Sequence, residues 1–157
     1  MNRLRNSLAL SLVALFVFTA SVYAGTLKVT SEDGEVLATF DQASIEALGL
    51  QEFKTETPWT DGTITFDGVS LTKVLAEADV QGKDIIGHAL DDYSASLSAE
   101  VIKSFDPIIA TRMNGVPMTV GDKGPFWIMF NFDDMPTNST IELRSLAIWH
   151  LNELEVE

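Results

Sequence analysis

The 157-residue chain contains no cysteine, so no disulfide bond can stabilise the fold that it adopts. This constraint matters because the first 24 residues have the layout of a secretory signal peptide. Arg3 and Arg5 give the basic start, and residues 8–19 give the apolar stretch. Val22 and Ala24 are the small residues that precede a cleavage site. Small exported domains often depend on disulfide bonds, whereas this chain must depend on a buried apolar core.

Cleavage after Ala24 would leave residues 25–157, which we expect to form one domain. No repeat, low-complexity tract or linker rich in Pro, Gly and Ser interrupts them, and a domain of this size can bury an adequate core. The apolar stretch is shorter than the roughly 20 residues of a membrane span. We therefore expect a periplasmic protein without membrane insertion after cleavage, with an uncleaved N-terminal anchor as the alternative.

The chain is strongly acidic, with a formal net charge of −13 from 23 acidic and 10 basic residues. The predicted signal peptide carries only basic charges, so the remaining residues are more acidic still. Such a surface repels the phosphates of nucleic acids and the head groups of anionic lipids. We therefore expect neither a nucleic-acid partner nor binding to a membrane surface.

The residue pattern predicts an α+β domain that is rich in β-structure and has a few short helices. Asp41 and Ser98 are suited to capping helices, Asp67-Gly68 is typical of a turn, and Asn114-Gly115 is typical of a hairpin. We expect strands over 26–30, 36–40, 51–57, 85–90, 93–97, 107–113 and 125–132, short helices over 42–48, 71–78 and 98–103, and a polar loop over 133–139.

Most familiar catalytic motifs are missing from the chain. It has no phosphate-binding loop, no dinucleotide-binding glycine pattern and no nucleophile elbow, and a cysteine nucleophile is impossible. His88 and His150 are each isolated and lack metal-ligand spacing. The acidic pairs 91–92 and 133–134 lack the alternating spacing of a calcium loop. We expect no metal site.

Aromatic residues give the clearest indication of a binding site. Trp59 and Trp127 lie in or beside expected turns, and Tyr93 follows two carboxylates at an expected strand corner. Aromatic rings stack on flat heterocycles, while carboxylates and a guanidinium can recognise the polar edge. The alternative is that Trp127 and Tyr93 belong to the core and that Trp59 covers it. The candidate ligand-binding residues are Trp59, Asp91, Asp92, Tyr93, Arg112 and Trp127.

Five segments follow one another in an order that resembles the molybdopterin-binding domain of the sulfite oxidase-like oxidoreductases. They are FDGVSL at 66–71, ALDDYSASL at 89–97, IATRMNGVPM at 109–118, GPFWIMF at 124–130 and AIWHL at 147–151. The resemblance covers most of residues 59–157 and implies a β-rich mixed-sheet or barrel-like fold. Enzymes of that family hold molybdenum through a cysteine thiolate in a strand before the first helix of this domain. The corresponding residues 51–65 contain no cysteine, which argues against catalysis.

The chain is also similar to small exported members of this fold, through TPWTDG at 57–62, DDY at 91–93, KGPFW at 123–127 and WHL at 149–151. Some of those proteins look like periplasmic pterin-binding regulators of an inner-membrane protein that makes or degrades cyclic di-GMP. The resemblance therefore implies a non-catalytic protein with a pterin ligand, no tightly bound cofactor and a membrane signalling partner. The alternatives are a molybdopterin-dependent oxidoreductase with an unusual ligand set, a binding module for another small molecule, or an interaction partner without a ligand.

Overall fold

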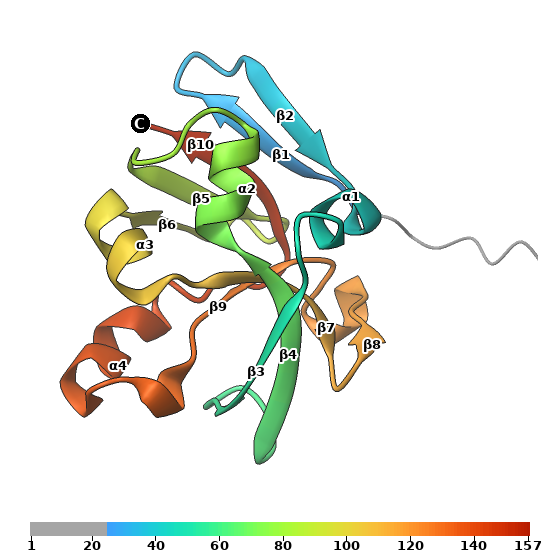
Figure 1. Ribbon diagram of the computed structural model, residues 1–157, viewed down its shortest axis with the longest axis vertical. Coiled ribbons are helices and arrows are strands. Elements are labelled where there is room, and N and C mark those ends of the chain that lie inside the picture. The colour runs from blue at the N-terminus through green and yellow to red at the C-terminus, as the bar shows by residue number, and fades with distance from the viewer. Residues whose placement is uncertain (1–24) are drawn as a thin grey trace, which may run out of the picture.

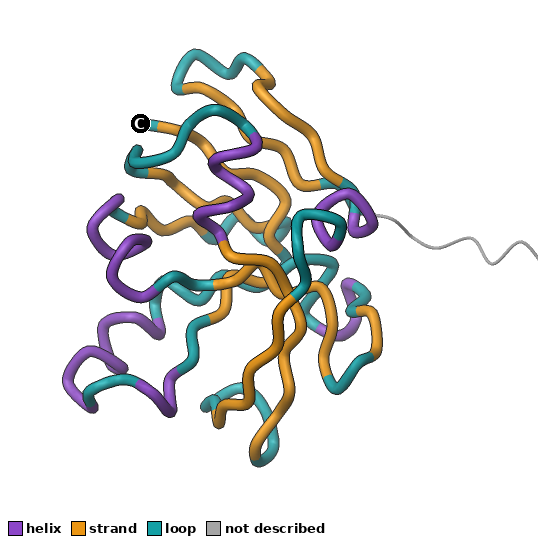
Figure 2. Tube along the Cα trace, viewed as in Figure 1, coloured by secondary structure: helices purple, strands orange, loops and turns teal. Residues whose placement is uncertain are grey.

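A computed structural model describes residues 25–157, apart from the side chains of residues 137 and 138. The predicted signal peptide lies outside the described residues. Two β-sheets form the body of the domain, and short helices lie at their periphery (Figures 1 and 2). In Figure 1 the first sheet and α2 occupy the upper half of the molecule, and the β3–β4 hairpin and α4 occupy the lower half. The predicted β-rich α+β fold is confirmed.

The first sheet is organised around the strand nearest the C-terminus, β10. Its strand order is β2-β1-β10-β5-β6. β10 pairs parallel with β1 on one side and antiparallel with β5 on the other. The two ends of the described chain therefore meet in the middle of one sheet. The strands are β1 (Leu27–Ser31), β2 (Val36–Phe40), β5 (Ile85–Ala89), β6 (Ser94–Leu97) and β10 (Leu151–Val156).

The second sheet is antiparallel and is centred on β4 and β7. β4 pairs with β3 and β7, and β7 also pairs with β8 and β9. The predicted Asn114-Gly115 hairpin is confirmed, because it joins β7 to β8. The strands are β3 (Gln51–Glu56), β4 (Thr63–Ser70), β7 (Ile108–Met113), β8 (Val116–Pro117) and β9 (Trp127–Met129).

Local capping signals account for two of the helices. The Asp41 carboxylate accepts a hydrogen bond from the backbone N–H of Ser44 at 2.7 Å and begins α1, and the Ser98 hydroxyl accepts one from Val101 and begins α3. None of the helices between residues 25 and 157 is long and apolar enough to span a membrane. The helices are α1 (Gln42–Glu46), α2 (Leu71–Glu77), α3 (Ala99–Phe105) and α4 (Thr137–Arg144).

The segment 124–130 connects the two sheets through the core. All seven of its residues are buried. Through β9 the segment pairs with β7 of the second sheet, while Phe126 O accepts a hydrogen bond from Leu151 N, the first residue of β10, at 2.9 Å. Ile128 N donates to Ile148 O at 2.9 Å. Because the chain lacks disulfide bonds, burial of this apolar segment is a principal source of stability.

Three local predictions were wrong. β4 runs straight through Asp67-Gly68, with a bulge opposite β7 in place of the predicted turn. The strand expected over 125–132 is confined to β9, because the apolar run reflects complete burial more than regular pairing. The expected polar loop 133–139 contains the start of α4, whose first four residues, TNST, have low helix propensity.

Replacing Gly68 with alanine should destabilise the fold. The added β-carbon would overlap the carbonyl oxygen of Ile109 and lie 2.7 Å from Cα of Ala110, and these backbone atoms cannot rotate away. Overpacking typically costs about 1–3 kcal/mol. We therefore expect Gly68→Ala to lower the free energy of unfolding, measured by chemical denaturation, by about 2 kcal/mol or more.

Gly121→Ala is the matched control, because its β-carbon would meet only the Thr119 hydroxyl at 3.5 Å. A surface change of this kind should alter the free energy of unfolding by less than about 0.5 kcal/mol. Equal stability of the two variants would contradict the close approach of β4 and β7 at Gly68.

Candidate functional site

A hollow lined largely by aromatic and apolar side chains lies between the β3–β4 loop, the β5–β6 corner and the segment from α4 to β10. Its volume is about 440 Å³, which is in the range of small-molecule sites. Arg144 is the one charged residue among its lining residues. We call it the aromatic hollow, and it is lined by Pro58, Trp59, Tyr93, Ile141, Arg144, Ser145, Ala147 and Trp149.

Three tryptophans form a cluster at this hollow. The ring centroid of Trp59 lies 6.0 Å from that of Trp127 and 5.6 Å from that of Trp149. Trp127 and Trp149 meet edge to face at 6.1 Å. Phe132 supports Trp59 from a further side at 6.1 Å. The rings therefore hold one another in place, and two of them present surface to the hollow.

Trp127 is the buried member of the cluster. It is fully buried and does not line the hollow, which it meets only through Trp59 and Trp149. Its Nε1 has no hydrogen-bond partner among the described residues. The structure thus places Trp127 in the core, which is the second of the two alternatives that the sequence left open. It packs behind the two rings that line the hollow.

Trp59 separates the aromatic hollow from a second one. Pro58 and Trp59 line both, so the indole forms a wall between them. The second hollow, of about 480 Å³, also contains the carboxylate-bearing Asp61 and the amide-bearing Asn114. A flat ligand could stack on the Trp59 ring from either side. The two sides differ in their polar groups, because Arg144 lines the aromatic hollow and Asp61 and Asn114 line the second one.

Tyr93 lines the aromatic hollow, whereas the two acids before it do not. The Tyr93 hydroxyl donates to the backbone oxygen of Ser145 at 2.6 Å and so ties the β5–β6 corner to the end of α4. Oδ2 of Asp91 lies 4.0 Å from Nδ1 of His150. Asp92 lines a separate polar hollow of about 280 Å³ that also contains His88. A role for Asp91 or Asp92 in ligand binding stays a prediction.

Arg112 lies apart from the aromatic hollow and pairs with Glu46 of α1. Its Nε and Nη2 donate to the two carboxylate oxygens of Glu46, each at 2.8 Å. Thr111 and Gln42 donate to the same carboxylate at 2.8 Å and 3.0 Å. The hydrogen bonds from Arg112 lower the pKa of Glu46 to about 2. In this geometry the guanidinium joins α1 to β7, and its predicted contact with a ligand remains untested.

Sequence reasoning did not select Trp149 or Arg144 as site residues. Trp149 is part of the WHL motif. The motif does not show that Trp149 packs against Trp59 and Trp127, because those residues are distant in the chain. No sequence pattern indicated that Arg144 lines a hollow, because α4, the helix that carries it, was not predicted. Lys123 adds a second cation near Trp149, with its Nζ 5.1 Å from the centre of that ring.

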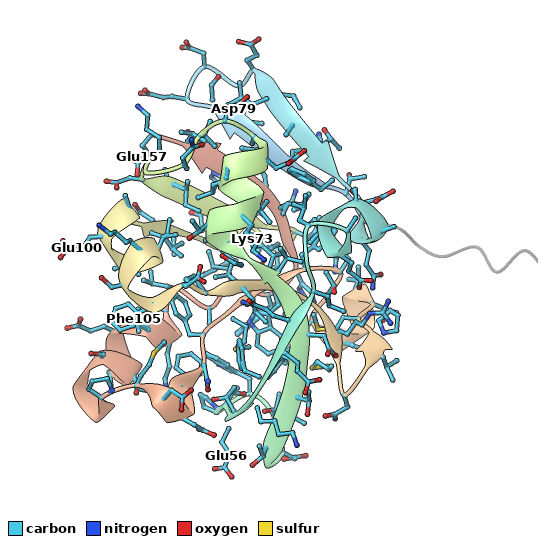
Figure 3. The ribbon with its side chains drawn as sticks, in the orientation of Figure 1. Glu56, Lys73, Asp79, Glu100, Phe105 and Glu157 are labelled. Atoms are coloured by element: carbon cyan, nitrogen blue, oxygen red, sulfur yellow. The ribbon has the colours of Figure 1, made fainter. Side chains whose placement is uncertain are left out.

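A larger hollow between α2 and α3 has a different character. Its volume is about 840 Å³, and no aromatic side chain lines it. Leu75 and Ile102 form its apolar floor, and Figure 3 labels Lys73 on α2 and Glu100 on α3, both of which line it. Because it offers no ring for stacking, the aromatic hollow is the better candidate for a flat heterocycle.

The residues present do not fit a molybdenum–thiolate centre. The chain has no cysteine, and the buried residues at the end of the β3 region are Thr55 and Thr57, which offer only hydroxyl groups. The hydroxyl of Thr55 is also within 3.3 Å of a carboxylate oxygen of Asp133. Within the described residues, no three His, Asp or Glu side chains are grouped so as to hold a metal ion. The aromatic hollow suits the flat ring of a pterin, but the soft ligand that molybdenum prefers is missing.

The Glu46–Arg112 pair should make stability depend on acid pH. The pKa of Glu46 is about 2 in the folded protein against a usual value of 4.5. Its contribution to stability is therefore complete above pH 4.5 and is lost as the pH falls from 4.5 towards 2. We expect Glu46→Gln to reduce the change in unfolding free energy across this interval, measured by urea denaturation at several pH values.

Glu77→Gln provides the comparison, because Glu77 is an exposed residue of α2. It should leave the acid dependence as in the parent protein. An unchanged pH dependence in Glu46→Gln would show that the ion pair contributes nothing to stability in this range.

Comparison with protein families connects this geometry to a known domain. A family model described as the oxidoreductase molybdopterin binding domain matches residues 30–129. The matched region includes Trp59, Tyr93 and Trp127 and ends before Arg144 and Trp149. A search of curated proteins finds no match. Since the family model covers more than half of the chain, the predicted membership is confirmed: the protein belongs to the sulfite oxidase-like family of oxidoreductase molybdopterin-binding domains.

Proposed function

We propose that this protein binds a pterin without catalysing a redox reaction. The observation that carries the proposal is the aromatic hollow, in which Trp59, Trp149 and Tyr93 surround a space suited to a flat bicyclic ring. Membership of a molybdopterin-binding family supports the ligand class, because molybdopterin itself contains a pterin ring. The volume and aromatic lining of the hollow, together with the family membership, support the proposal.

The chemistry of the lining residues favours reversible binding. Indole and phenol rings stack on a heterocycle, with each aromatic contact contributing about 0.5–1.5 kcal/mol beyond its buried area. The hydroxyl groups of Tyr93 and Ser145 line the hollow and can pair with the polar edge of a pterin, whereas the carboxylate of Asp61 and the amide of Asn114 lie on the other side of Trp59. A redox reaction at molybdenum would need a ligand set that this sequence lacks.

The proposal extends to location and partner. The resemblance to small exported pterin-binding proteins, together with the signal-like N-terminus, supports a periplasmic protein that regulates an inner-membrane enzyme of cyclic di-GMP metabolism. Co-purification with the periplasmic domain of such an enzyme should depend on added pterin. Equal co-purification with and without pterin would contradict regulation by the ligand.

Replacing Trp59 should weaken pterin binding. Trp59 lines the hollow and contacts Trp149, so Trp59→Ala removes one stacking surface and loosens another. We expect the dissociation constant for pterin, measured by titration of ligand fluorescence, to rise about tenfold, equivalent to about 1.4 kcal/mol. Trp59→Phe keeps a ring and should give an intermediate value.

Leu37→Ala is the control for this experiment, because it removes an exposed apolar side chain on β2 that does not line the aromatic hollow. It should leave the dissociation constant unchanged, and thermal unfolding of each variant checks that it remains folded. If the parent protein binds no pterin, or if Trp59→Ala binds as tightly as the parent, the proposed site is wrong.

A further inference from the structure

We propose that the outer edge of β2 is a docking site for an extended segment of a partner protein, which adds to the first sheet as a further strand. The segment carries apolar or β-branched residues between basic ones. The starting observation is that β2 ends the first sheet, so its outer backbone N–H and C=O groups have no partner among the described strands. The docking site is independent of the proposed pterin function, because no residue of β2 lines the aromatic hollow.

β2 lacks the side chains by which an edge strand normally avoids such pairing. Its sequence, VLATF, contains no charge and no proline, and the exposed fractions of Val36 and Leu37 are 53% and 41%. A bulge interrupts its pairing with β1 near Val36, but Ala38, Thr39 and Phe40 keep a regular register. In Figure 1 β2 lies at the margin of the domain, with no other element beyond it. The edge is therefore open to a further strand over at least these three residues.

The other edge strands are protected, which makes β2 the exception among the described strands. β3 carries Glu52, Lys54 and Glu56, and β8 is two residues long and ends in a proline. The exposed side chains of β6 are those of its two serines, and β9 is fully buried. An apolar and uncovered sheet edge is the kind of surface that binds extended peptides by strand addition.

Acidic residues at both ends of β2 define the charge of the partner segment. Three of them lie in the turn 32–35 before the strand, Asp41 follows it, and all four are exposed. None of the four forms an ion pair with a described side chain. Lys28 is the neighbouring cation on β1, and on its other side it lies opposite Glu153. An uncharged strand between acidic ends is complementary to an apolar segment between Lys or Arg residues.

A second copy of the same chain is a poorer occupant of this edge. If two copies of β2 paired antiparallel about Ala38, Glu35 of each copy would lie opposite Asp41 of the other. Like charges directly opposite one another destabilise a sheet. Two chains that each carry a net charge of −13 also repel one another at longer range. The edge is therefore better suited to a basic partner than to self-association.

The test uses a fluorescent peptide, KKVTVTVKK, in which β-forming residues lie between lysines, and the matched acidic peptide EEVTVTVEE. The parent protein should bind the basic peptide about tenfold or more tightly than the acidic one, measured by fluorescence anisotropy in the absence of pterin. Hydrogen exchange should slow over residues 36–40 when the basic peptide is bound, because the outer backbone amides gain hydrogen-bond acceptors.

Leu37→Lys should weaken binding of the basic peptide about tenfold, because it removes an apolar contact and places a cation at the edge. Val116→Lys is the matched control, since it makes the same change of charge at an exposed apolar residue of β8. It should bind the basic peptide as the parent does. Thermal unfolding of both variants checks that they remain folded.

Glu35→Gln is a second variant, which leaves the strand itself unchanged. It should weaken binding of the basic peptide about threefold, because one opposite charge at the end of β2 is lost. Glu77→Gln removes an exposed acid from α2 and should have no such effect.

The docking site is wrong if the parent does not prefer the basic peptide, if Leu37→Lys and Val116→Lys weaken binding equally, or if hydrogen exchange slows elsewhere than in β2. Sedimentation of the parent as a dimer that Leu37→Lys dissociates would identify a second copy as the occupant and overturn the basic partner. Loss of pterin binding would leave each of these results unchanged, so this docking site and the proposed function fail separately.

Discussion

Burial of the segment 124–130 is the constraint on which the rest of this structure depends. A chain without cysteine must obtain its stability from apolar burial, and Phe126, Trp127 and Phe130 in this segment are fully buried. The same segment is hydrogen-bonded to β7 of the second sheet through β9 and to the start of β10 in the first sheet through Phe126. One buried segment therefore both fills the core and joins the two sheets. Trp127 then provides the fixed surface against which Trp59 and Trp149 pack.

The site is assembled from segments that are far apart in the chain. Trp59 comes from the β3–β4 loop, Tyr93 from the β5–β6 corner, and Arg144 and Trp149 from the region between α4 and β10. The buried core positions Trp59 and Trp149, and the hydrogen bond from Tyr93 to Ser145 fixes a third side. The molybdopterin-binding domain family is represented here by a chain without cysteine, in which Trp59, Tyr93 and Trp149 line one hollow.

Local signals in the sequence predicted much of the fold. The helix caps at Asp41 and Ser98 and the hairpin at Asn114-Gly115 were predictable, because each depends only on residues a few positions away in the chain. α4 escaped prediction because its first turn lacks both helix propensity and an apolar period. Trp59 and Tyr93, two of the predicted ligand-binding residues, line one hollow, and their contact with a ligand stays a prediction. The ion pair of Arg112 joins residues 66 positions apart, and no local pattern could have indicated it.

The parallel pairing of β1 with β10 has a consequence for how the chain acquires its structure. Lys28 lies opposite Glu153. β1, the first strand of the described chain, therefore pairs with β10, the last one. Contacts of such long sequence separation slow folding, because a large loop must close before the pairing stabilises it. Until β10 is in place, β1 and β5 both expose unpaired edges. Nascent or truncated chains lacking the final strand would thus be unusually open to pairing with strands of other molecules.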